Sequence, residues 1–327
     1  MSTLSQAASI PLPYDLSCAP EWFMKKARFA KRFFLNLAPI RYSLVSENGG
    51  PIADIEYGQT EYLGQMWQLC RATLQEDFQH PMGKKLCLFN PADGSGMGLT
   101  RLEARAKAVS EALERWAYTE TSSGPDAVLY GYPYSMSTKG MAAFPSLFPG
   151  QARRSAIAEA FEYHSIDAWW GGSLNHWIIN REDASIVFIN QPEFNGHVAL
   201  AIRHLEGLDN YVAAYGIGSG ATPAEAELKA QLEACRSQSV LERRSATPAT
   251  ARNKPVLEAE QRMLEFSSHE GFEIVKERLA SRPWMPALKP KVIYDGPVTG
   301  PWNKYAHVWR YALEPYPIKY KQKQFVA

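Results

Sequence analysis

The sequence predicts an α/β protein built on two pseudo-repeated units, each a strand, a glycine-rich loop and a helix, with a mixed or antiparallel sheet. The first observation behind this fold class is an internal repeat. The segment 94–115, GSGMGLTRLEARAKAVSEALER, returns 122 positions later as the segment 216–236, GIGSGATPAEAELKAQLEACR. The second observation is a set of four short apolar runs between positions 176 and 215, which predict strands ahead of the second copy. Self-similarity at a fixed offset indicates a duplicated structural unit.

We expect one compact domain over residues 1–327, because no low-complexity tract or clean linker divides the chain. The repeat units span about 86–118 and 208–240, and residues 1–20 form an N-terminal extension. Ten of the nineteen positions from 94 to 112 are identical in the two copies. In the first copy they are Gly94, Gly96, Gly98, Thr100, Glu103, Ala104, Lys107, Ala108, Glu111 and Ala112.

Composition and charge exclude several classes of protein. Lys and Arg number 35 against 34 Asp and Glu, so the net charge of +1 gives no global field for nucleic acid or an anionic membrane. The cysteines lie far apart without a CxxC motif, which argues against a zinc site or a disulfide framework; they are Cys18, Cys70, Cys87 and Cys235. The chain shows no signal peptide and no apolar run of roughly 18 residues, so we expect a soluble, cytoplasmic protein.

The first half of the chain predicts an amphipathic helix, a strand–helix pair and the first repeat. Residues 21–37 form the amphipathic helix, with a solvated cationic face or, alternatively, a membrane-surface face. A strand over 52–55 and a helix over 60–76 follow, and the apolar run 86–90 is the strand that enters the first glycine loop. Past the repeated helix we expect a strand over 127–132.

The second half begins with a helix over 153–164 and the sequence Trp169-Trp170-Gly171-Gly172, which is a packed aromatic corner or a substrate shelf. The predicted strands then cover 176–180, 185–190, 197–203 and 210–215, with Asn195-Gly196 as hairpin-turn residues. A helix over 255–279, interrupted near Gly271, and strands over 292–295 and 305–313 complete the chain.

Three glycines at alternate positions let a backbone turn tightly and approach a ligand closely. The helix that follows presents free N–H groups and a positive dipole end, so the element favours a phosphate. It lacks the Gly-Lys-Ser/Thr of a Walker loop, and its third glycine comes one residue too early for the GxGxxG dinucleotide motif.

The repeated helices also carry carboxylates. At roughly 100° per residue, Glu103, Lys107, Glu111 and Glu114 share one face of the first helix. The second copy places Glu225, Lys229 and Glu233 in the same way, with Arg236 at the position of Glu114. Two such helices facing each other would gather oxygen ligands for Mg²⁺, with amides and an arginine on phosphates. The competing interpretation is a solvated face with ordinary pairs four residues apart.

The motif Glu111-Ala112-Leu113-Glu114-Arg115 resembles the ExxER core of the SxxExxER motif of the YcaO family, and GATPAEAELKAQLEA resembles the family's later GNTxxEA helix. The resemblance covers approximately 86–313, with motif-level agreement limited to the two helices. It implies a YcaO-like fold that binds ATP and Mg²⁺. It implies Glu111, Glu114 and Glu233 as metal ligands, and it places Ser110, Arg115, Ala221, Glu225 and Ser237 at the nucleotide.

The chain departs from the family pattern at three positions. Ala108 replaces the motif's Ser, Ala221 its Asn and Ser237 the Gln of its ExxxQ element. A literal ExxxQ occurs from Glu227 to Gln231, but Glu227 falls on the wrong helix face. The PxPxP ending of many azoline-forming members is also missing.

The resemblance implies an enzyme that uses ATP to activate backbone amides of a ribosomal precursor peptide, most simply a cyclodehydratase that converts Cys, Ser or Thr to azolines. A leader-binding E1-like partner, a flavin dehydrogenase partner and assembly into a homo- or hetero-oligomer are further expectations. The alternatives are thioamide or amidine formation, a catalytically degenerate scaffold subunit of a peptide-modifying complex, and a duplicated protein for another phosphorylated metabolite.

Overall fold

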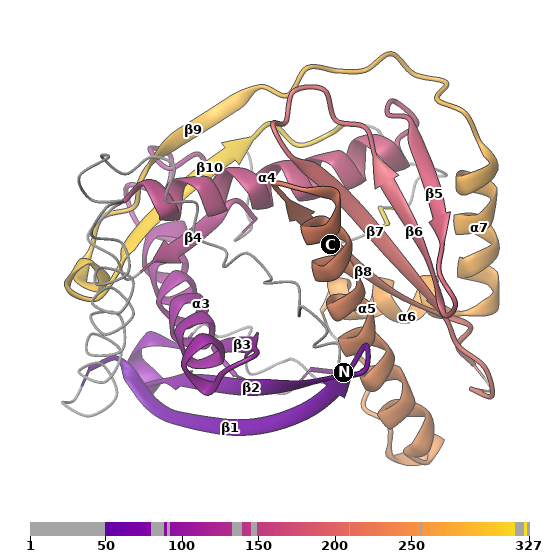
Figure 1. Cartoon of the computed structure of the whole chain (residues 1–327). Coiled ribbons are helices and arrows are strands. Elements are labelled where there is room, and N and C mark those ends of the chain that lie inside the picture. The colour runs from indigo at the N-terminus through magenta and orange to yellow at the C-terminus, as the bar shows by residue number, and fades with distance from the viewer. Residues whose placement is uncertain are drawn as a thin grey trace, which may run out of the picture.

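The computed structural model describes residues 50–79, 88–89, 92–132, 139–144, 149–208, 210–255, 257–317 and 324–325. Its strands form three antiparallel sheets, and five α-helices cover or join them. In Figure 1, the helices α3, α4 and α5 lie around the middle of the molecule, with the sheets outside them. The helix expected over 21–37, the N-terminal extension, Cys18 and Cys87 lie outside the described residues.

The first sheet consists of β1 (Ile52–Tyr62), β2 (Gln65–Leu74) and β3 (Gly94–Gly98) in that order, and it leads into α3 (Arg101–Ser122). The helix predicted over 60–76 was therefore wrong. Leu63 and Gly64, with φ of 55° and 68°, form the two-residue link of a hairpin. Such links need left-handed backbone at both positions. Asparagine at the first position would have indicated this turn in the sequence, and leucine does not.

The four-stranded sheet runs β5 (His176–Asn180), β6 (Ala184–Ile189), β7 (His197–His204) and β8 (Ala213–Gly220), followed by α5 (Pro223–Ala246). The first three strands agree with the prediction to within one residue. The fourth begins later than predicted and extends through the glycines. Asn195 and Gly196 belong to the longer connection 190–196 between β6 and β7, so the predicted tight hairpin turn is replaced by a loop.

The third sheet has the order β4 (Met141–Phe144), β10 (His307–Leu313), β9 (Val292–Pro297). The long helix α4 (Gly150–Trp170) packs against β4 and β10 and also meets the four-stranded sheet. The predicted strand over 127–132 is a series of turns. The predicted interrupted helix is α6 (Glu258–Ser267) and α7 (His269–Ala280), separated by Ser268, whose hydroxyl caps α7. Single 3₁₀ turns occupy Glu76–Phe78, Ala249–Ala251 and Pro301–Lys304.

The repeated glycines form strands, which corrects the predicted glycine loops and the strand predicted over 86–90. Alternate residues of a strand point to one face, and in both copies the glycines face the following helix. A Cβ on Gly96 would lie 1.9 Å from the carbonyl oxygen of Ala104, and one on Gly218 would lie 2.7 Å from that of Ala226. The glycines therefore let the backbone of the helix approach the strand closely, whereas the sequence predicted that a ligand approaches there.

Trp169 and Trp170 are fully buried where α4 ends, so the aromatic corner is confirmed and the substrate shelf is excluded. Both rings pack with Phe325 and adjoin Phe266 or His176. Among the residues that the structure describes, Cys70 and Cys235 are buried free thiols. None of the described helices is long and apolar enough to cross a bilayer.

Candidate functional site

The threonine that recurs in both repeats caps each helix. Thr100 accepts the N–H of Glu103 at 3.2 Å, and Thr222 accepts that of Glu225 at the same distance. Each glutamate carboxylate in turn accepts the backbone N–H that precedes the cap, from Leu99 at 3.1 Å and from Ala221 at 2.9 Å. Two otherwise unpaired donors at each helix start are satisfied in this way. Glu225 and Ala221, both predicted at the nucleotide, are thus paired with each other.

The repeated lysines connect each helix to the strand before it by a hydrogen bond. Lys107 Nζ donates to the carbonyl oxygen of Met97 at 2.8 Å, and Lys229 Nζ donates to that of Ser219 at 2.7 Å. Together with the caps, these contacts explain why polar residues recur in register without any ligand. Helix capping and helix–strand contacts therefore account for the repeated threonine, the first repeated glutamate and the repeated lysine.

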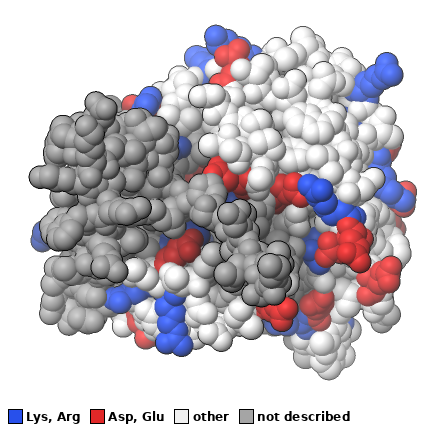
Figure 2. All heavy atoms as spheres, in the orientation of Figure 1, with Lys and Arg blue, Asp and Glu red and all other residues white. Residues whose placement is uncertain are grey.

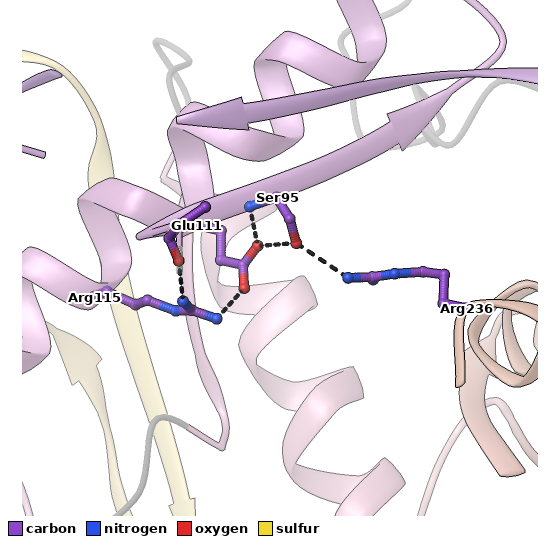
Figure 3. A network of polar contacts seen from close by, with 5 residues as sticks. Ser95, Glu111, Arg115 and Arg236 are labelled. Atoms are coloured by element: carbon purple, nitrogen blue, oxygen red, sulfur yellow. Dashed lines mark hydrogen bonds and ion pairs between the residues drawn. The ribbon is translucent and has the colours of Figure 1, made fainter. Parts of the chain in front are cut away.

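The second repeated glutamate lies deeper. Glu111 Oε2 accepts the backbone N–H of Ser95 at 2.6 Å and its hydroxyl at 3.1 Å, while Glu111 Oε1 pairs with Arg115 Nη2 at 2.5 Å. Glu233 accepts the N–H of Ile217, the equivalent of Ser95, at 3.1 Å. Arg115 also donates to the carbonyl oxygen of Ala92 at 3.0 Å, so it holds Glu111 in place, as Figure 3 shows.

The helix α4 adds two carboxylates that the sequence analysis missed, Glu159 and Glu162. Burial raises the pKa of Glu114 well above its usual value, and the carboxylates of Glu159 and Glu111 raise it further. Burial also raises the pKa of Glu159, with Glu162 and Glu111 adding to the effect. The spacing of three residues between Glu159 and Glu162 repeats that of Glu111 and Glu114, and this spacing was the available signal.

Glu233 completes the set from α5. Burial, aided by Glu162, raises the pKa of Glu233 to about 7. Pairwise electrostatic effects thus link five carboxylates from α3, α4 and α5, and we call Glu111, Glu114, Glu159, Glu162 and Glu233 the acidic cluster. Acidic atoms gather across the middle of the face shown in Figure 2. The carboxylates keep some accessible area, 31% for the Glu111 side chain, yet the surrounding helices desolvate several of them strongly.

Polar residues border the acidic cluster. Hydrogen bonds from Ser219 and the charge of Lys229 partly oppose the burial that raises the pKa of Glu162. Burial and the surrounding carboxylates, Glu233 first among them, raise the pKa of Tyr163 well above its usual value, so this phenol stays a neutral donor. The ammonium of Lys139 lies 4.3 Å from the centre of the Tyr163 ring.

The remaining predicted site residues occupy less open positions. Ser110 is half-buried on α3 and has a partner within the described structure. Ser237 is buried at 9% exposure on α5. The structure thus brings Glu111, Glu114, Glu233 and Arg115 together and leaves Glu225 and Ala221 at the helix start.

The donor chemistry of the acidic cluster fits Mg²⁺, which prefers carboxylate oxygens. Within the described residues, no three His, Cys, Asp or Glu side chains come close enough to form a metal site on their own. Magnesium is usually held by one or two carboxylates together with waters and substrate phosphates. The carboxylates therefore suit a metal that a nucleotide helps to bind.

No protein-family model and no curated protein matches the sequence. Solved structures match its fold. The structure of YcaO from Methanopyrus kandleri bound with AMPPCP and Mg²⁺ aligns over 86% of this chain and 90% of that one, with 16% identity and a TM-score of 0.50. The E. coli microcin synthetase McbBCD complex with pro-MccB17 bound aligns over 79% and 86%, with 12% identity and a TM-score of 0.53.

A heterocyclase in complex with substrate and cofactor aligns over 86% of this chain and 52% of its own, with 11% identity and a TM-score of 0.51. Identities at this level establish the fold alone. The chain has a YcaO-like α/β fold with antiparallel sheets, as the resemblance of its two helices predicted.

Proposed function

We propose that this chain is a divergent YcaO enzyme that uses ATP and Mg²⁺ to activate backbone amides of a ribosomal precursor peptide, most simply by cyclodehydration of Cys, Ser or Thr to azolines. The observation that carries the proposal is the convergence of Glu111, Glu114 and Glu233 from the two repeats, beside Glu159 and Glu162 of α4. The fold is that of a YcaO structure bound with AMPPCP and Mg²⁺.

In this proposal, the acidic cluster binds the metal and the polar residues around it orient the ligands. Magnesium, when bound, supplies neutralisation of phosphate charge. Arg115 fixes the carboxylate of Glu111 by the 2.5 Å ion pair, so the oxygen ligand is preorganised. Tyr163 remains a neutral hydrogen-bond donor among the carboxylates. The arrangement suits phosphoryl transfer, in which positioning and charge stabilisation supply most of the catalysis.

The wider assignments belong to the same proposal. The substrate is a precursor peptide, and a leader-binding E1-like protein presents it, with a flavin dehydrogenase as a further subunit. The microcin synthetase of similar fold is itself a complex with pro-MccB17 bound. We propose a single domain that acts in the cytoplasm.

The test is nucleotide binding by the whole chain, measured with a fluorescent ATP analogue with and without Mg²⁺. Glu111→Gln and Glu114→Gln each remove a carboxylate charge from the acidic cluster and are expected to weaken Mg²⁺-dependent binding by about 10-fold or more. Glu120→Gln is the matched control, because Glu120 is exposed near the other end of α3. A wild-type chain that binds no nucleotide in the presence of Mg²⁺ would contradict the proposal.

A catalytically degenerate scaffold is the second candidate, and the departures at Ala221 and Ser237 favour it. Ala221 contributes only its backbone N–H, which Glu225 accepts, and Ser237 is buried. Nucleotide binding without ATP hydrolysis, in the presence of the precursor peptide and its partner protein, would select the scaffold. Hydrolysis that Glu111→Gln abolishes would select the enzyme.

A further inference from the structure

The two repeats share several contacts between strand and helix. Caps, lysine contacts and the glutamate-to-strand hydrogen bonds recur in both copies. Two of the positions at which the copies differ are Glu114, which becomes Arg236, and Ser95, which becomes Ile217. The first difference reverses a charge, and the second removes a hydroxyl group.

Arg236 and Ser95, one residue from each of these two differences, contact each other across the repeats. Arg236 Nη2 of α5 donates to Ser95 Oγ of β3 at 3.2 Å. The Ser95 hydroxyl in turn donates to Glu111, so one oxygen joins the guanidinium of the second repeat to the carboxylate of the first. Figure 3 shows Arg236 extended from its helix toward Ser95 and Glu111.

Arg236 also lies one turn beyond Glu233 on α5. It is exposed, its charge acts on the carboxylate of Glu233, and Ser95 connects it to the carboxylate of Glu111. A guanidinium has five N–H donors in a planar fork that matches phosphate oxygens. The contact with Ser95 engages one of its terminal nitrogens, so the fork can also meet a ligand that enters between α3 and α5.

We propose that Arg236 is a phosphate-binding residue, which makes the site asymmetric: α3 supplies the carboxylates of Glu111 and Glu114 for the metal, whereas α5 supplies the carboxylate of Glu233 and a cation for the polyphosphate. The inference rests on the proposed function, because it assigns a role within the same nucleotide site. The charge reversal from Glu114 to Arg236 then has a chemical purpose, since a carboxylate at position 236 would repel the phosphates that Arg236 attracts.

The experiment compares Arg236→Ala, Arg236→Lys and Arg236→Glu by titration with ATP, ADP and AMP in the presence of Mg²⁺. Loss of a charge-assisted contact is expected to weaken ATP binding about 10- to 100-fold in Arg236→Ala. The loss should be smaller for AMP, and Arg236→Lys should recover part of it. Arg236→Glu should bind ATP most weakly and, without nucleotide, should bind more Mn²⁺ than the wild type.

Arg243→Ala is the matched control, because Arg243 lies two turns further along α5 and donates to its own helix at Ser239. Melting temperatures separate a phosphate contact from a structural tether between the repeats. Unchanged ATP affinity in Arg236→Ala, whether or not its melting temperature falls, overturns the inference while wild-type nucleotide binding keeps the proposed function. Failure of the wild type to bind any of the nucleotides overturns both.

Discussion

At the scale of single residues, His164 makes stability depend on pH. It is buried in α4 with its ring edge-on to Tyr316, and burial lowers its pKa from 6.5 to about 4. Between these values an unfolded chain binds the proton and the folded chain does not, so the free energy of unfolding falls as pH drops below 6.5. We expect a loss of about 2 kcal/mol between pH 7 and pH 5 from this group.

Urea unfolding at both pH values measures that slope, and His164→Gln should flatten it. His269→Gln is the matched control, because His269 is exposed at the start of α7 and should leave the slope unchanged. The comparison uses slopes, since His164→Gln also changes packing at every pH. Equal slopes in the wild type and His164→Gln would show that other groups cause the dependence.

The sequence predicted Glu111, Glu114, Glu233 and Glu225 as site residues, and the structure places the first three in the acidic cluster and Glu225 at the start of α5. All four lie on repeated helices, and helical periodicity alone does not show which glutamates face a helix start. Glu225 accepts the N–H of Ala221 at 2.9 Å, a local contact between residues four positions apart that involves no residue of the first repeat. Glu159 escaped notice because only the tertiary fold brings α4 between the repeats.

At the scale of elements, the strand–helix contact of each repeat depends on its glycines. A Cβ on Gly96 would meet Ala104 and Ala108 at 1.9 Å and 2.6 Å, so Gly96→Ala must push α3 away from β3. Overpacking of this kind costs about 1–3 kcal/mol. Gly58→Ala is the matched control, because that strand glycine meets nothing closer than Leu69 Cβ at 3.8 Å.

Urea midpoints of the two variants provide the measurement, and similar values would remove the close-packing explanation of the repeat.

The close contact between glycine strand and helix also explains why the sequence predicted a loop. Alternate glycines permit close approach of any backbone or ligand, and a single sequence does not say which one approaches. β2 was mistaken for a helix because its buried residues Cys70 and Leu74 are also four positions apart.

At the scale of the whole molecule, the duplication predicted two related halves but not what lies between them. Each half contains three consecutive antiparallel strands of which the last packs against its own helix, β1–β2–β3–α3 in the first half and β6–β7–β8–α5 in the second, where β5 adds a fourth strand (Figure 1). Within each half, the elements that contact each other are neighbours along the chain, so the sequence pattern predicts them. The third sheet joins β4 to β10, more than 160 positions later in the chain, and such pairing leaves no local pattern.

Phe325 likewise contacts elements that lie far apart in the sequence. It is 3% exposed and stacks on Trp170 of α4 at 4.7 Å, with Phe266 of α6 at 5.0 Å and Tyr215 of β8 at 5.2 Å. Phe325→Ala removes an aromatic ring from three elements at once and should lower the free energy of unfolding by about 3–5 kcal/mol. Phe325→Leu keeps most of the apolar volume and should lose less.

Urea unfolding followed by tryptophan fluorescence measures both changes, because the ring covers Trp169 and Trp170. Leu129→Ala is the control for an apolar truncation, since Leu129 is 69% exposed and its loss should change stability by no more than about 0.5 kcal/mol. A Phe325→Ala chain as stable as Leu129→Ala would mean that the aromatic cluster is complete without Phe325. A large loss of stability would show that Phe325 supports the packing of α4, the helix that carries Glu159 and Glu162 into the acidic cluster.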